Sequence, residues 1–313
     1  MGHEHCEHEH SHEHGVGHTH APKDFGRAFV IGTGLNLALV VVQIVFGLLA
    51  HSLALLADAG HNFADVLGLG LAWWTNTLCR SAPTHKHTYG LRGASILAAL
   101  ANAVLLLVTM GGVAWEAIVR LRQPAEVQGR TVIWVAAVGI VINGASALLF
   151  FSGRKGDLNV RAAFFHLAAD AGISLGVVLT GVARVMTGRH WIDPLMSLVI
   201  VAIIIHGTWG LLKDSMNLAL QAVPAGIDAN AVRGYLARLP GVTAVHDLHI
   251  WAMSTKETAL TAHLLKPDGK LDDDILHEIS HEMEHRFQIQ HVTVQWEQGN
   301  GAQTCKQEPD EVV

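Results

Sequence analysis

The chain has 313 residues, of which 50% are hydrophobic and only 15% are charged, and its positive mean hydropathy of +0.32 is typical of a membrane protein with a modest soluble part. The net charge of −6 is small, and acidic residues gather toward the C-terminal end, which argues against a basic patch for nucleic acid. The three cysteines are far apart, which argues against a disulfide framework and against a thiolate zinc finger.

A histidine-rich segment opens the chain. Eight of the first 20 residues are histidine, alternating mainly with glutamate, and without an apolar period residues 1–24 are predicted to form a disordered tail. Tracts of His and Glu bind zinc, nickel or copper loosely because many ligand sets are possible. An expression tag is the alternative, but tags are usually uninterrupted histidine runs. We therefore interpret the segment as a native metal-collecting or metal-sensing tail.

Six apolar runs follow, and each reaches the roughly 20 residues that a helix needs to cross a bilayer core. They lie near residues 28–50, 53–77, 91–115, 131–151, 162–184 and 192–212. Prolines fall between the runs or at their ends, where helices tolerate them. The sequence therefore predicts a six-helix transmembrane domain over residues 25–213. Lys and Arg are more frequent in the segments that would lie on the same side of the membrane as the N-terminus. Because such residues are in excess on the cytoplasmic side, we expect both termini in the cytoplasm.

Two His-x-x-x-Asp motifs lie inside these runs, His61 with Asp65 and His166 with Asp170. Residues four apart share one face of a helix, so each motif can aim an imidazole and a carboxylate at one point. A charged side chain in the bilayer core costs at least ~2.5–3.5 kcal/mol, so such residues are rare and usually functional. Two such helices facing each other would suit a tetrahedral divalent ion such as zinc. The alternative is a pair of structural His–Asp contacts that tie helices together.

The fifth run continues into Gly172-Ile-Ser-Leu-Gly176, a small-xxx-small pattern that lets another helix approach closely. We therefore expect the second and fifth helices to pack together, as a shared metal site requires.

The polar loop between the second and third runs carries two histidines, His85 and His87. They are either a second metal site or ordinary surface residues, and the sequence leaves both possibilities open.

The chain becomes more polar after residue 213. We expect a helix over 228–239, strands over 243–251 and 257–265, a helix over 271–287 and a strand over 290–296. The order α-β-β-α-β predicts a cytoplasmic α+β domain of the ferredoxin-like type over residues 214–298, followed by a disordered tail over 299–313. Adjacent strands could bring His246, His263 and Glu297 together as a regulatory metal site. The alternative is a solvated sheet face.

A competing motif lies in the second helix of this domain. His277-Glu278-Ile-Ser-His281 matches H-E-x-x-H, the helical signature of zinc proteases, and predicts a membrane metalloprotease if it is read literally. The helix is charged rather than membrane-embedded, and a domain of this size leaves little room for a substrate cleft. Histidine and glutamate on the polar side of an amphipathic helix also produce the match by chance.

Several motifs resemble those of the cation diffusion facilitator family, most closely its zinc-exporting bacterial branch. They are SLALLADAGH over residues 52–61 with Asp65, His166-x-x-x-Asp170, HDLHIW over 246–251 and HVTVQWE over 291–297. The resemblance implies a homodimer of six-helix subunits in the bacterial inner membrane, with cytoplasmic ferredoxin-like domains. It also implies a secondary transporter, and no enzyme, that exports Zn²⁺, or Co²⁺, Cd²⁺ or Ni²⁺, in exchange for protons.

The resemblance also assigns residues to sites. His61, Asp65, His166 and Asp170 match the family's transport site, and His246, His263 and Glu297 match positions that bind zinc in the cytoplasmic domains of some members. His85 and His87 match a loop site of some members, although Leu91 replaces a further histidine of that pattern. Zinc would therefore be both the substrate and a regulatory ligand. Cobalt or nickel as the main substrate, and a metal sensor that does not transport, remain the alternatives.

Overall fold

The computed structural model describes residues 27–79, 82–150, 158–268 and 273–299. The six long helices are α1 (Arg27–Leu49), α2 (Leu53–Cys79), α3 (Ala94–Arg122), α4 (Gly129–Phe150), α5 (Leu158–Thr187) and α6 (Ile192–Ala219). The later elements are α7 (Ala229–Leu236), β1 (Ala244–Ala252), β2 (Thr258–Leu265), α8 (Asp273–His285) and β3 (His291–Glu297). The tails expected to be disordered, 1–24 and the part of 299–313 beyond residue 299, lie outside the described residues.

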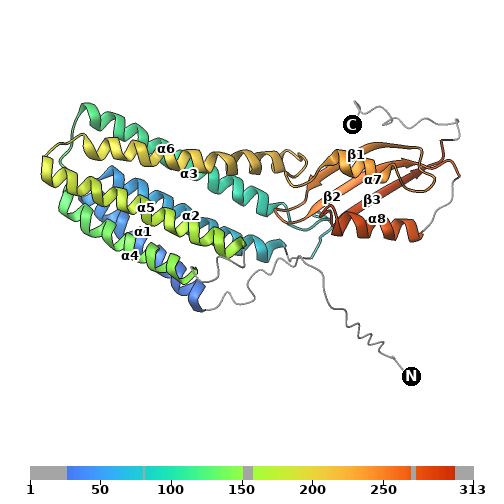
Figure 1. The fold of residues 1–313 in the computed structure, drawn as a ribbon, viewed down its shortest axis with the longest axis horizontal. Coiled ribbons are helices and arrows are strands. Elements are labelled where there is room, and N and C mark those ends of the chain that lie inside the picture. Colours follow the sequence, from blue (N-terminus) through green and yellow to red (C-terminus); the bar gives the residue numbers. More distant parts are fainter. Residues whose placement is uncertain (1–26, 80–81, 151–157, 269–272, 300–313) are drawn as a thin grey trace, which may run out of the picture.

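The long helices form a bundle, and the sheet lies beyond one end of it (Figure 1). Many outward side chains of the bundle are large and apolar: Trp134 is 75% exposed, Leu148 70% and Val141 68%. Such a surface is typical of contact with lipid. Within the described residues, α3, α4, α5 and α6 are long and apolar enough to span a membrane. The chain therefore has a helical membrane domain, whereas the full count of six crossing helices stays a prediction.

Helices α3 and α6 each end about seven residues beyond the apolar run that predicted them. The third run was expected to end near residue 115, but α3 continues to Arg122 and ends just before Pro124. A residue that precedes proline disfavours the helical conformation, which explains this end. The sixth run was expected to end near residue 212, but α6 continues to Ala219. Residues 213–219 contain neither proline nor glycine, so polarity alone does not stop the helix.

Helices α4 and α5 approach each other closely where their glycines Gly129 and Gly181 meet. A Cβ atom at Gly181 would lie 2.8 Å from Ile133 Cγ1 and 3.0 Å from the carbonyl oxygen of Gly129. The pair Gly172 and Gly176 was expected to do this, but Cβ atoms there would have no described atom within 4 Å. The prediction therefore named the wrong glycines of α5, because the small-residue pattern does not show which face of a helix meets a neighbour. α2 and α5 are nevertheless in contact, as expected.

A buried carboxylate holds the end of the bundle that is remote from the sheet. Asp193, at the start of α6, is 1% exposed and accepts hydrogen bonds from Ser52 Oγ at 2.5 Å and from the backbone N–H of Leu53 at 2.8 Å. The carboxylate therefore satisfies a free donor at the N-terminus of α2 and complements the helix dipole. Arg120 of α3 donates to the carbonyl oxygen of His51 at 2.5 Å, in the same turn. The turn between α1 and α2 is thus tied to both α3 and α6.

The sheet has the order β1-β2-β3, with β1 antiparallel and β3 parallel to β2. A parallel pair needs a crossover connection, and α8 supplies it. One face of the sheet packs against α7 and α8 around a core that includes Leu236, Leu260, Leu264, Ile279 and Met283. The expected order α-β-β-α-β is therefore observed, with element ends that differ from the predicted ones by at most three residues.

The loop between α2 and α3 contacts the sheet domain. Arg92 Nη1 lies 2.8 Å from Glu257 Oε2, and Ser95 Oγ accepts a hydrogen bond from the backbone N–H of Thr255 at 3.1 Å. The ring of Tyr89 meets that of His291 edge to face, with centroids 5.5 Å apart. These contacts join the membrane domain to the turn between β1 and β2 and to the start of β3.

Replacing Asp193 should destabilise the whole bundle. Asp193→Asn keeps the shape of the side chain but replaces one of its two acceptor oxygens with an NH₂ group, which would face a hydrogen-bond donor. The expected loss in the free energy of unfolding is about 1–3 kcal/mol. The thermal unfolding midpoint of the purified protein in detergent should therefore fall. Asp214→Asn, on the exposed side of the same helix, is the matched control and should leave the midpoint unchanged. Equal midpoints for the two variants would contradict the anchoring role of Asp193.

Candidate metal centres

The four residues of the two His-x-x-x-Asp motifs lie together between α2 and α5. His61 Nε2 lies 3.1 Å from Asp170 Oδ1 and 3.8 Å from Asp65 Oδ2. His166 Nε2 lies 3.4 Å from Asp65 Oδ2 and 3.6 Å from Asp170 Oδ2. Each imidazole therefore faces both carboxylates, one from its own helix and one from the other.

These spacings are close to those of a tetrahedral metal site. With zinc–ligand bonds of ~2.0–2.1 Å, neighbouring ligand atoms of a tetrahedron lie about 3.3 Å apart. Ligand atoms of His61, Asp65 and Asp170 all lie within 4.8 Å of one another. His166 stands slightly apart, with its ring centroid 6.1 Å from that of His61. The cluster could hold a divalent ion after a small inward movement of one imidazole.

Burial differs sharply across the cluster. The Asp170 side chain is 4% exposed and His61 is 16% exposed, whereas His166 is 50% exposed. His61 Nδ1 is a buried polar atom that has no hydrogen-bond partner among the described residues. Unsatisfied buried polar atoms are rare and often mark a functional site. An ion would approach this cluster from the side of His166.

A second buried carboxylate lies one helical turn from His61, and it belongs to a different network. Asp58 is fully buried and its Oδ2 accepts hydrogen bonds from Gln43 Nε2 at 2.6 Å and from Ser174 Oγ at 3.0 Å. Asn62 Nδ2 in turn donates to Gln43 Oε1 at 3.0 Å. The network links α1, α2 and α5. The sequence motif contained Asp58, but its partners are too distant in sequence to show in any local pattern.

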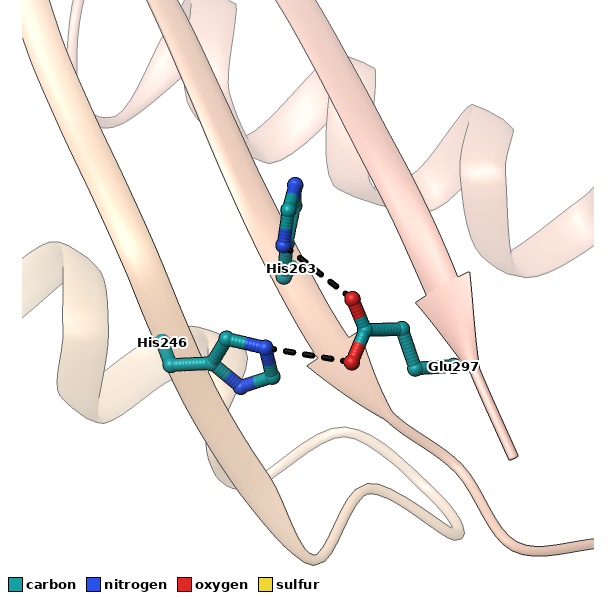
Figure 2. Close-up of side chains that lie close together, drawn as sticks. All are labelled: His246, His263 and Glu297. Carbon is teal, nitrogen blue, oxygen red and sulfur yellow. Dashed lines mark ion pairs between the residues drawn. The ribbon is translucent and has the colours of Figure 1, made fainter. Parts of the chain in front are cut away.

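The second cluster lies on the face of the sheet that α7 and α8 leave open (Figure 2). Each strand contributes one residue: His246 from β1, His263 from β2 and Glu297 from β3. Glu297 Oε2 lies 3.1 Å from His246 Nε2, and Glu297 Oε1 lies 3.1 Å from His263 Nδ1. The three ligand atoms lie within 4.8 Å of one another, and all three side chains are less than 20% exposed. This group could also hold a metal ion.

Register explains how the three side chains meet. His246 pairs with His263 across the antiparallel strands, so their side chains are direct neighbours. Glu297 pairs with Leu265, which places it two residues diagonally from His263 on the same face. Diagonal neighbours of this kind are within reach of long side chains. The three side chains therefore lie together, as the sequence predicted. Metal binding by this group stays a prediction.

Sequence reasoning missed two neighbours of this group. Asp247 Oδ2 lies 3.3 Å from His263 Nε2, and Asp247 Oδ1 lies 2.7 Å from His249 Nε2. Strict alternation along β1 would put His246 and His249 on opposite faces. A register shift between them pairs His246 with His263 and His249 with Thr261, two residues away on the same face of β2, and Asp247 takes a positive φ of 49° within the shift. Asp tolerates this conformation better than most residues, but an Asp in a strand does not by itself predict it.

The remaining histidine motifs do not form comparable groups in the described part of the chain. His85 and His87 are both exposed in the loop after α2, and neither belongs to a group of three close ligands. His277 and His281 lie on the exposed side of α8, where the ring of His281 instead lies near that of His285, with the ring centroids 4.3 Å apart and the planes tilted by 50°. The loop site and the H-E-x-x-H site therefore gain no support from the geometry.

Comparisons with known proteins cover both halves of the chain. The family model of the cation efflux transmembrane domain matches residues 29–218, and that of the cytoplasmic domain of cation efflux proteins matches residues 224–299. The zinc transporter ZitB of Escherichia coli is 34% identical, covering 89% of this chain and 90% of its own length. The metal cation efflux system protein CzcD of Cupriavidus metallidurans is 32% identical, covering 90% of both chains. The cadmium, cobalt and zinc/H(+)-K(+) antiporter of Bacillus subtilis is 30% identical, covering 90% of this chain and 92% of its own.

The hydrogen bond between Gln43 and Asp58 should couple these two residues energetically. Residues in direct contact usually show a coupling of about 0.5–3 kcal/mol in a double-mutant cycle. Gln43→Ala, Asp58→Ala and the double variant should therefore give non-additive losses of stability in detergent unfolding. A cycle of Asp58→Ala with Thr208→Ala is the control, because Thr208 bonds to a carbonyl of its own helix. Additive losses in the first cycle would contradict the network.

Proposed function

Because this chain belongs to the cation diffusion facilitator family of cation efflux proteins, we propose that it exports Zn²⁺ from the cytoplasm in exchange for protons. The family consists of metal-transporting membrane proteins, so the chain is a transporter and not an enzyme. The observation that carries the proposal is the group of two imidazoles and two carboxylates between α2 and α5. His61, Asp65, His166 and Asp170 are the proposed transport ligands.

Proton exchange follows from the chemistry of these ligands. A metal ion binds neutral imidazole and ionised carboxylate, so protons and the ion compete for the same atoms. Histidine ordinarily titrates near pH 6.5, within the range of pH gradients across cell membranes. We propose that Zn²⁺ binds from the cytoplasm and that protons from the more acidic side displace it. A movement of α2 and α5 relative to their neighbours would then change the side to which the site opens.

The ligand set favours zinc among the candidate metals. Zinc commonly binds two nitrogens and two oxygens in a tetrahedron, and Co²⁺ accepts similar sites. The relatives are named for zinc in one case and for cadmium, cobalt and zinc in another. Cobalt or nickel as the main substrate is the second candidate, because the same cluster would accept either.

The broader arrangement of the protein is proposed on the same basis. All six long helices would cross the bacterial inner membrane within a domain over residues 25–213, with both termini in the cytoplasm. The domain over residues 214–298 would adopt a ferredoxin-like fold and hold two subunits together as a homodimer. The group of His246, His263 and Glu297 would bind Zn²⁺ as a regulatory ligand. Its position on the open face of the sheet supports this role.

Removing one carboxylate of the transport cluster should abolish transport. Asp170→Asn keeps the volume of the side chain but removes the charge that the metal requires, so Zn²⁺ flux into proteoliposomes should fall to the level of protein-free vesicles. The variant should remain monodisperse and folded. The control replaces His277 and His281 together with Gln and should transport normally. Normal flux in Asp170→Asn would remove this cluster from the mechanism, and lost flux in the control would favour the H-E-x-x-H motif.

The direction of the pH gradient should set the direction of zinc movement. With Zn²⁺ outside, proteoliposomes with an acidic lumen should accumulate the metal as protons leave, whereas vesicles with an alkaline lumen should accumulate much less. Zinc-sensitive and pH-sensitive dyes inside the vesicles would follow both ions. Co²⁺ and Ni²⁺ measured in parallel would rank the substrates. Equal accumulation under both gradients would contradict proton exchange.

A further inference from the structure

A continuous chain of alternating imidazoles and carboxylates crosses the open face of the sheet. It begins at the buried His246 and passes through Glu297, His263 and Asp247 to His249, with successive contacts of 3.1, 3.1, 3.3 and 2.7 Å. Exposure of the side chain is 8% at His246 and 42% at His249. The proposed regulatory site consists of the first three residues of this chain, and Asp247 and His249 are not among its ligands.

The backbone is distorted at the point that brings Asp247 into the chain. The pairing of β1 with β2 shifts between His246 and His249, and Asp247 lies in the left-handed region with a φ of 49°. A non-glycine residue in this region is strained, and such strain persists where the surrounding structure maintains it, often beside functional sites. The distortion has a clear effect: it directs Asp247 to the far side of the His263 ring while His246 still faces Glu297.

We propose that Asp247 is a positioning residue that orients His263 for metal binding. The inference rests on the proposed regulatory site of His246, His263 and Glu297. Asp247 Oδ2 lies 3.3 Å from Nε2 of His263, so it would accept the Nε2–H and place the ring proton on that nitrogen. The lone pair of Nδ1 then faces Glu297 and the metal position. His249 holds the other oxygen of Asp247 at 2.7 Å and so fixes the carboxylate.

Geometry separates Asp247 from the ligands themselves. The two nitrogens of an imidazole point in different directions, and in Figure 2 the second nitrogen of His263 points away from Glu297. One ion cannot contact both Nδ1 of His263 and the oxygen beside Nε2. Asp247 is accordingly not part of the group whose ligand atoms lie within 4.8 Å of one another. A carboxylate behind a ligating histidine fixes its tautomer and strengthens its donation, which is typically worth 10–100-fold in metal affinity.

The test is a zinc titration of the full-length protein in detergent, in competition with a chromophoric chelator. Every protein in the comparison also carries Asp170→Asn, so that zinc binding at the transport cluster is weakened to the same extent in all of them. Asp247→Asn retains a residue that tolerates positive φ but removes the charge. Asp247→Gly favours positive φ and removes the side chain. We expect zinc affinity at the sheet site to fall about tenfold for Asn and up to about 100-fold for Gly.

Stability of the metal-free protein distinguishes positioning from a structural role. Asp247→Gly relieves backbone strain, so its unfolding midpoint without metal should be equal to or above that of the parent while its zinc affinity falls. A midpoint that falls together with the affinity would make Asp247 a structural residue and overturn the inference. The loss of one zinc equivalent, with the remaining affinity unchanged, would make Asp247 a ligand of a separate ion and would also overturn it.

Glu297→Gln separates this inference from the proposed function on which it rests. This variant removes a proposed ligand, and the zinc equivalents that it loses define the sheet site. If Glu297→Gln binds zinc like the parent, the proposed regulatory site itself is wrong. If Glu297→Gln loses zinc while both Asp247 variants bind as tightly as the parent, the regulatory site stands and the positioning role of Asp247 is wrong.

Discussion

A carboxylate inside an apolar helix bundle needs hydrogen-bond donors or a cation, and this requirement organises the membrane half of the protein. Three buried aspartates meet it in three ways. Asp193 accepts donors from Ser52 and the start of α2, and Asp58 accepts amide and hydroxyl donors from α1 and α5. Asp170 instead faces an imidazole from another helix. The first two accept hydrogen bonds from fixed neutral donors and hold helices together, whereas the third depends on a partner that protons or metal can change.

The two candidate metal sites have the same alternation of imidazole and carboxylate groups, although one lies in a helix bundle and the other on a sheet. In the bundle, a four-residue helical spacing places each imidazole above a carboxylate of its own helix. In the sheet, three adjacent strands each supply one ligand, and a register shift adds a carboxylate behind one histidine. Both sites alternate imidazole and carboxylate, so each ligand is held by groups of complementary character before any metal arrives. Such preorganisation reduces the rearrangement that binding requires.

Periodic features were predictable from the sequence, and contacts between distant segments were not. Apolar runs located the long helices, and the four-residue spacing identified His61, Asp65, His166 and Asp170 before the structure showed them together. The sequence does not identify Asp58 as the partner of Gln43, because 15 residues separate them. The role of Asp247 was hidden because alternation along a strand assumes an undistorted register. The glycines that allow close helix packing were misplaced for a similar reason, since a small-residue pattern does not identify the opposing helix.

The junction between the bundle and the sheet has a mechanical consequence. The side chains of Arg92 and Glu257 are 39% and 37% exposed, so water and dissolved ions reach their contact. An exposed ion pair contributes only about 0–1 kcal/mol, and salt screens it over a Debye length of about 8 Å at physiological ionic strength. Thermal energy is therefore sufficient to open this contact. The strength of this one contact between the bundle and the sheet domain therefore varies with the ionic strength of the surrounding solution.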